Sequence, residues 1–202
     1  MGDEDAVAFT PNLYFDSSFD VEAAKISPGE YYVTKRDMVL VTVLGSCVAA
    51  CIRDRVSGIG GMNHFMLPDM IRDENNPASV SARYGSYAME MMINQLLKAG
   101  ARRGNLEAKI FGGGRVLQGL VTANVGERNA GFALDYLRRE GIAISGQDLL
   151  EDYARKVYFF PNSGRVLVKK IRTMHNETIV RREQEYRARL RAANIQGDVE
   201  LF

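Results

Sequence analysis

Several residue types are scarce in this chain, and each scarcity narrows what the protein can be. The 202 residues include no tryptophan, five prolines, two cysteines and two histidines. Two cysteines cannot form the disulfide framework that holds small secreted domains together. No apolar run approaches the roughly 20 residues that a membrane helix needs. We therefore expect a cytoplasmic protein with free thiols, not inserted in a membrane.

The spacing of the two cysteines also argues against a disulfide between them. If Cys47 and Cys51 share a strand, their Cα atoms lie roughly 13 Å apart at about 3.3 Å per residue. A disulfide needs Cα atoms within about 7 Å of each other. Both cysteines are therefore expected to be free.

An excess of charge of one sign is missing as well. Lys and Arg number 26 against 25 Asp and Glu, which leaves a net charge of +1. Proteins that bind duplex nucleic acid carry a basic patch that neutralises phosphates, so we expect no nucleic-acid partner. The opening Met1–Asp5 is acidic and lacks the basic start of a secretory signal.

The remaining composition is that of one globular domain with terminal extensions. Hydrophobic residues make up 46% and charged residues 25% of a chain long enough for one substantial core. The boundaries that we expect are an N-terminal extension over 1–27, a main domain over 28–175 and an arginine-rich helical extension over 176–202. Residues 1–25 show no clean period of two or 3.6.

Apolar patterns predict a strand-rich α+β domain with two main helices. Short apolar runs between turn signals predict strands at Tyr31–Val33, Met38–Leu44, Val48–Ile52, Ile59–Leu67, Leu106–Phe111, Ile142–Ser145, Val157–Phe160 and Arg165–Ile171. Apolar residues at i, i+3 and i+4 predict helices at Ala82–Ala99 and Glu127–Glu140, each followed by a terminating glycine. A further helix is predicted over 176–196.

Two unusual segments remain. Gly112–Gly114 follow a strand but match no phosphate-loop motif, so we interpret them as glycines that let the backbone pass close to neighbouring groups, including those of a site. Residues 181–191 hold five arginines and two glutamates. Such a run predicts a solvated helix face, with docking to an acidic partner or to the acidic N-terminus as the alternative.

The stretch Thr42–Cys51 carries the strongest chemical signal. Cys47 follows the small pair Gly45 and Ser46, whose backbone N–H groups could stabilise a developing oxyanion. His64 is the one histidine in a predicted core strand, and it could favour the thiolate of Cys47 and act as its base. Thr42 lies close enough in sequence to orient the imidazole.

Plainer interpretations stay open. A free cysteine most often packs in a core, as we expect for Cys51, and a lone buried histidine is most often a hydrogen-bonded structural residue. A zinc site formed by Cys47, Cys51 and His64 is a further alternative, although the paired C-x-x-C spacing of such sites is missing.

The same residues carry a resemblance to a known family. The motifs LGSCVAACIRD, GIGGMNHFMLP, ARYGSYAMEMMINQLLKAGA, LEAKIFGGG, NVGERN and SGRVLVKK, spread over residues 28–172, resemble the CheD family of chemoreceptor glutamine deamidases. The resemblance implies packed mixed β-sheets with helices outside, as in bacterial toxin cysteine deamidases. It also implies a protein-glutamine glutaminase of the chemotaxis system, a hydrolase without metal or organic cofactor.

Carried over residue by residue, the resemblance implies that Cys47 is the nucleophile, His64 the general base and Thr42 the third member of the set. Ser46, Gly45 and Asn63 are then expected around the oxyanion and the substrate. The expected partners are the cytoplasmic domains of methyl-accepting chemotaxis receptors and a CheC-type phosphatase. Two alternatives remain: a non-catalytic adaptor for those partners, and a cysteine hydrolase that acts on another amide.

Overall fold

The computed structural model describes residues 12–68, 77–116, 125–171 and 176–192, which form two five-stranded sheets and three α-helices. Sheet A has the order β1 (Asn12–Asp16), β2 (Val21–Lys25), β4 (Val39–Leu44), β9 (Ala154–Phe160) and β10 (Arg165–Ile171). Sheet B has the order β3 (Tyr31–Thr34), β6 (Gly60–Asn63), β5 (Val48–Asp54), β7 (Leu106–Gly112) and β8 (Ala143–Leu149). Each sheet contains one parallel pair, β2–β4 or β7–β8, among antiparallel ones.

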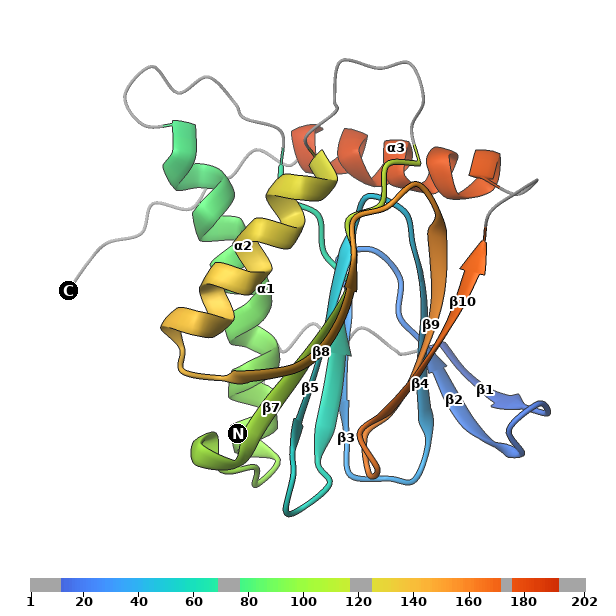
Figure 1. Ribbon diagram of the computed structural model, residues 1–202, viewed down its shortest axis with the longest axis vertical. Coiled ribbons are helices and arrows are strands. Elements are labelled where there is room, and N and C mark those ends of the chain that lie inside the picture. The colour runs from blue at the N-terminus through green and yellow to red at the C-terminus, as the bar shows by residue number, and fades with distance from the viewer. Residues whose placement is uncertain (1–11, 69–76, 117–124, 172–175, 193–202) are drawn as a thin grey trace, which may run out of the picture.

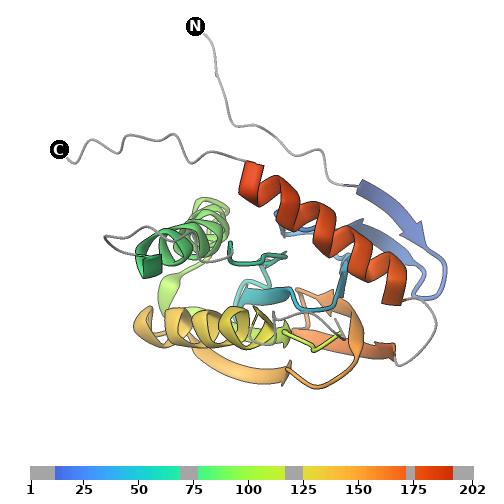
Figure 2. The ribbon, with the colours of Figure 1, turned by 90° about the horizontal axis from the view of Figure 1, so that it is seen from above.

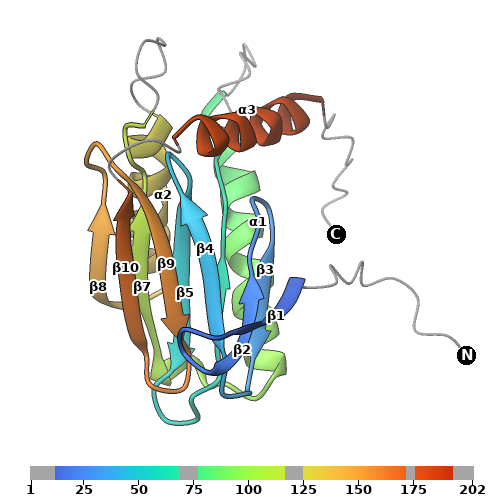
Figure 3. The ribbon, with the colours of Figure 1, turned by 90° about the vertical axis from the view of Figure 1, so that its right-hand side faces the viewer.

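The layers are stacked as sheet A, sheet B and a pair of helices (Figure 1). The helices α1 (Pro77–Lys98) and α2 (Val125–Arg139) cover the outer face of sheet B. The third helix, α3 (Asn176–Ala192), lies across one end of the two sheets (Figures 2 and 3). The predicted α+β class with packed mixed sheets and two main helices outside is confirmed.

Strand β5 shows how the sequence produces these layers. Successive side chains of a strand point to opposite faces. Val48, Ala50 and Ile52 face the helices, whereas Ala49 and Cys51 pack in the core between the sheets. A strand covered on both faces has no reason to alternate with polar residues, which is why this segment is apolar throughout.

Strand β4 alternates in the same way and fixes the direction of Thr42. Leu40 and Leu44 pack between the sheets, whereas Val39 and Val41 pack on the outer face of sheet A. Thr42 shares the parity of Leu40 and Leu44, so its side chain also points into the space between the sheets. It is 1% exposed there.

The helix predictions hold closely. In α1 the predicted apolar stripe is buried at Met89, Met92, Ile93 and Leu96. The predicted terminators Gly100 and Gly141 have φ of +105° and +68°, the left-handed conformation that favours glycine. The hairpin of β9 and β10 is confirmed as well, with its strands in register from Ala154 to Ile171.

Two strand predictions need correction, and two further strands lie where none was predicted. The strand expected over Ile59–Leu67 ends at Asn63, followed by a single bridge between Phe65 and Val48. The strand expected over Ile142–Ser145 continues to Leu149 as β8. Residues 12–25, which have no clean period, form β1 and β2, and β2 joins sheet A beside β4.

Candidate active site

The predicted site lies where the chain crosses from one sheet to the other. β4 belongs to sheet A and β5 to sheet B, and residues 45–47 connect them at the end of the sandwich that α3 covers (Figure 1). Cys47, the last of the three, is completely buried and packs with the core between the sheets. We call residues 45–47 the crossing loop.

The carbonyl groups of the crossing loop are all held from one side. The N–H of Gly114 donates to the carbonyl of Gly45 (2.7 Å) and that of Gly113 to the carbonyl of Cys47 (2.8 Å). The side-chain Nδ2 of Asn129, on α2, donates to the carbonyl of Ser46 (2.9 Å). With its carbonyls engaged in this way, the loop turns its N–H groups in a common direction.

Those N–H groups converge on one carboxylate. The N–H groups of Gly45 and Cys47 donate to Oε1 of Glu183 at 3.0 and 3.1 Å. The N–H and hydroxyl of Ser46 donate to Oε2 at 3.1 and 2.7 Å. Successive N–H groups aimed at one point form an anion-binding concavity. The loop therefore binds an anion at Gly45 and Ser46, the residues at which we expect the oxyanion site.

The histidine predicted as base is buried between the sheets and bonded to the predicted threonine. Oγ1 of Thr42 lies 2.8 Å from Nδ1 of His64 and 2.7 Å from the carbonyl oxygen of Ile26. That carbonyl can only accept, so it takes the single hydroxyl proton of Thr42. Nδ1 of His64 must then donate to Oγ1, which leaves the neutral ring with its lone pair on Nε2.

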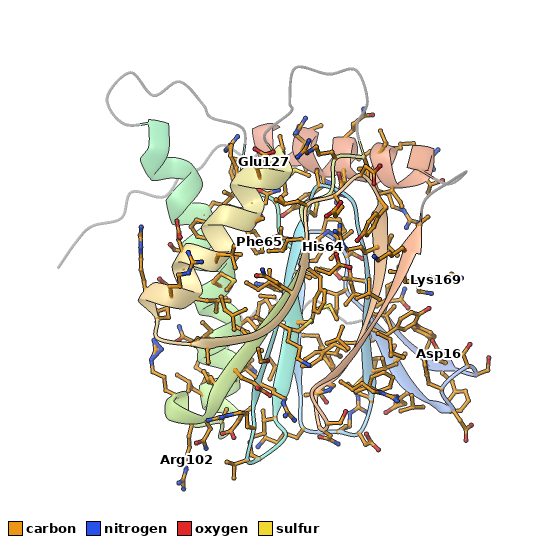
Figure 4. The ribbon with its side chains drawn as sticks, in the orientation of Figure 1. Asp16, His64, Phe65, Arg102, Glu127 and Lys169 are labelled. Atoms are coloured by element: carbon orange, nitrogen blue, oxygen red, sulfur yellow. The ribbon has the colours of Figure 1, made fainter. Side chains whose placement is uncertain are left out.

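Nε2 of His64 is buried and has no hydrogen-bond partner among the described residues. An imidazole nitrogen with a free lone pair can accept a proton. His64 lies in the upper part of the sandwich, near α3 (Figure 4). The Thr42–His64 contact therefore orients the imidazole and leaves Nε2 without a hydrogen-bond partner among the described residues.

Strand pairing brings His64 toward Cys47. Val48 bridges Phe65 and Cys51 pairs with Met62 in one antiparallel register. In that register His64 lies opposite Ala49, so Cys47 is its diagonal neighbour. Diagonal neighbours on one face have Cα atoms roughly 7–8 Å apart, which long side chains can bridge.

Burial keeps both groups neutral in this conformation. It lowers the pKa of His64 to about 4, because the protonated ring would lose its hydration. Burial also raises the pKa of the Cys47 thiol, and the nearby Glu183 carboxylate raises it further by repulsion and by accepting a hydrogen bond. The site therefore holds a thiol and a neutral imidazole near pH 7.

Not every predicted residue joins this cluster. Oδ1 of Asn63 accepts from the N–H of Ala50 (2.9 Å), and its Nδ2 is directed at Ala88 and Met89 of α1. Its side chain is thus turned to the helix side of sheet B. Cys51 is a buried free thiol whose pKa is raised by burial. The described residues contain no cluster of three or more His, Cys, Asp or Glu side chains suited to a metal ion.

Sequence patterns did not reveal two side chains of the site, Glu183 and Asn129. Each is a polar residue in a predicted helix and lies outside any predicted apolar face, which indicates an exposed position. In the structure, however, Glu183 is 4% exposed and Asn129 is 0% exposed. Asn129 also accepts from the N–H of Leu67 (2.9 Å), so it ties the segment after β6 to the crossing loop. The triple glycine is the one sequence feature that did indicate a further part of the site. Gly113 and Gly114 approach the crossing loop closely, as predicted.

A thiol, an imidazole with a free nitrogen and a row of converging N–H groups are the parts that thiol-dependent amide hydrolases use. Residues 66–170 match the family model described as CheD chemotactic sensory transduction. The chain belongs to the CheD family.

Relatives in the family are similar along nearly the whole chain. Proteins described as probable chemoreceptor glutamine deamidase CheD are 66% identical over 192 residues in Methylobacillus flagellatus, 62% over 194 in Herminiimonas arsenicoxydans and 65% over 191 in Thiobacillus denitrificans. The matches cover 95%, 96% and 95% of this chain and the same shares of the three relatives. Among the described residues, no helix has the length and apolar character to cross a membrane.

Proposed function

We propose that this protein is a protein-glutamine deamidase that converts particular glutamine side chains of chemoreceptors to glutamate in the cytoplasm. The family membership and the names of the close relatives support the reaction and its substrate class. The observation that carries the proposal is the row of N–H donors at residues 45–47, which includes the N–H of Cys47, together with the buried Nε2 that the Thr42–His64 contact leaves free. We assign the chemistry to residues 28–175, which supply every group of the mechanism.

The first half of the reaction forms a thioester. Sγ of Cys47 attacks the side-chain carbonyl carbon of the glutamine, and the thiol proton passes to Nε2 of His64. The carbonyl oxygen becomes an oxyanion, which the N–H groups of Gly45, Ser46 and Cys47 stabilise. As the C–N bond breaks, His64 returns the proton to the nitrogen, and ammonia leaves.

The second half regenerates the enzyme. His64 takes a proton from a water molecule, whose oxygen attacks the thioester carbon. The C–S bond breaks, the proton returns to the sulfur of Cys47, and the glutamine has become a glutamate. The sum is one water consumed and one ammonia released.

The other predicted residues act indirectly. Thr42 accepts from Nδ1 of His64 and so keeps the lone pair on Nε2. For Asn63 we propose a positioning role in place of substrate contact. Its side-chain amide accepts a hydrogen bond from the N–H of Ala50 and donates one to the carbonyl of Ala88 on α1. These bonds fix the end of β6, which His64 directly follows.

The test is mass spectrometry of a chemoreceptor cytoplasmic fragment incubated with the wild type, Cys47→Ala or His64→Ala. We expect the wild type alone to add about one dalton at defined glutamines and to release ammonia, because the reaction needs both groups. If the glutamines stay intact while the protein forms a stable complex with the receptor or with a CheC-type phosphatase, the protein is a non-catalytic adaptor and the proposed reaction is wrong. A CheC-type phosphatase remains our proposed second partner.

A further inference from the structure

The helix α3 is attached to the rest of the protein along one narrow face. Ile179, Glu183 and Tyr186 are buried and Leu190 is partly buried, a spacing of four, three and four residues that places them on one side of a helix. Its other described side chains are partly or fully exposed. The attached face is therefore mainly apolar, with Glu183 near its centre and a buried guanidinium nitrogen of Arg187.

Glu183 occupies the anion site of the crossing loop completely. Both carboxylate oxygens are bonded, Oε1 by Gly45 and Cys47 and Oε2 by the N–H and hydroxyl of Ser46, at 2.7–3.1 Å. The fit leaves no spare room: a Cβ added at Gly45 would lie 2.7 Å from Oε1. The side chain also interacts with the thiol of Cys47 itself.

A glutamate side chain is the product of the proposed reaction. We propose that α3 is a built-in occupant of the active site, which holds the Glu183 carboxylate where the product glutamate of a substrate would lie and must leave before a substrate glutamine can enter. This inference rests on the proposed function and adds its regulation. The N–H groups that bind Glu183 cannot bind a substrate carbonyl at the same time.

The attachment has the features of a reversible occupant. Because α3 belongs to the same chain, its effective concentration at the site is high and needs no tight contact. The anchoring face is small, and Tyr186 adds a hydrogen bond of 2.5 Å to Tyr84 on α1. A substrate therefore competes with α3 for the site. Only molecules in which α3 is undocked can bind it, so the apparent Kd of the substrate is its intrinsic Kd divided by the undocked fraction.

The sharpest test makes α3 into a substrate. In Glu183→Gln the docked helix presents a side-chain amide to Cys47, so the protein should convert the introduced glutamine back to glutamate, with a gain of about one dalton at that position. The double variant Cys47→Ala with Glu183→Gln should keep the amide. The exposed neighbour Gln184 reports spontaneous deamidation in the same peptide.

A second test does not depend on turnover. Glu183→Ala should speed the alkylation of Cys47 by iodoacetamide about tenfold or more, because it removes both the occupant and the repulsion of the thiolate. The control is Glu185→Ala, which truncates an exposed glutamate on the same helix and should keep the wild-type rate. Peptide mapping separates Cys47 from Cys51.

The two proposals can fail separately. Three results together would overturn the inference: equal rates of receptor modification by wild type and Glu183→Ala, an intact amide in Glu183→Gln, and unchanged alkylation of Cys47. The helix α3 would then be a structural cap. If no variant modifies the receptor fragment but Glu183→Ala exposes Cys47, the proposed function fails while the occupancy by α3 stands.

Discussion

At the scale of single residues, the proposed mechanism makes Thr42 the group that selects which nitrogen of His64 acts as base. Its hydroxyl proton goes to the carbonyl of Ile26, so Nδ1 carries the ring proton. In Thr42→Val that constraint is lost, and we expect deamidation of the receptor fragment to slow about a hundredfold at neutral pH. Thr42→Ser keeps the hydroxyl and should recover most of the rate.

The pH profile separates this role from a merely structural one. In the proposed mechanism His64 acts as a base only when neutral, and burial lowers its pKa to about 4, so we expect the rate to fall as the pH falls through about 4. Burial is the main cause of that value, so Thr42→Val should keep the acid limb near the same pH and lose rate on the plateau. A plateau at the wild-type level, measured per folded molecule, would contradict the assignment.

At the scale of elements, the end of β7 shapes the crossing loop. Gly112 has φ of +113°, and a Cβ there would lie 2.1 Å from the carbonyl oxygen of Cys47. We expect Gly112→Ala to lower the free energy of unfolding by about 2 kcal/mol or more and to reduce activity, because the loop must shift. Urea unfolding and the receptor assay measure the two effects.

Gly131 on α2 provides the matched control. A Cβ there meets nothing within 4 Å. Gly131→Ala should therefore stabilise the helix by about 0.5–1 kcal/mol and leave activity unchanged. If Gly112→Ala were equally harmless, the close approach of β7 to Cys47 would not matter for the site.

The elements also show which patterns the sequence carries. The ends of α1 and α2 could be predicted because each is followed by a glycine, the residue that most readily adopts the positive φ found there. The apolar run Ile59–Leu67 predicts one long strand, but the strand ends at Asn63. Beyond it Phe65 makes an isolated bridge, and Met66 and Leu67 are buried outside any strand. Apolarity reports burial, not conformation. β1 was missed because its residues are largely exposed on both faces and show no alternation.

At the scale of the whole molecule, the site combines side chains that are close together in the sequence with one that is far from them. Thr42, Cys47 and His64 lie within 23 residues, so a local motif could predict them together. Glu183 lies 136 residues beyond Cys47 and sits in an arginine-rich run that indicates a solvated helix. The helix α3 crosses the end of the sandwich (Figure 3). Only this tertiary arrangement places the Glu183 side chain against the crossing loop, where it is buried.

The same arrangement predicts that α3 opens without the sandwich unfolding. β5 is buried on both faces and paired on both sides, whereas α3 is held by a narrow strip of side chains and is otherwise polar. Most of the stability of a helix in a protein comes from the tertiary packing of one face, and the packed face of α3 is narrow. Amide hydrogen exchange should therefore be much faster in α3 than in β5, through a local opening.

Tyr186 should control that opening, because it is buried and its hydroxyl joins α3 to α1 through Tyr84. We expect Tyr186→Ala to speed exchange throughout α3 and alkylation of Cys47, while exchange in β5 changes little. Tyr87→Ala, which removes an exposed tyrosine from α1, serves as the control and should leave all three rates unaltered. Exchange in α3 at the rate of β5, even in Tyr186→Ala, would mean that the helix leaves only on global unfolding and cannot admit a substrate by opening alone.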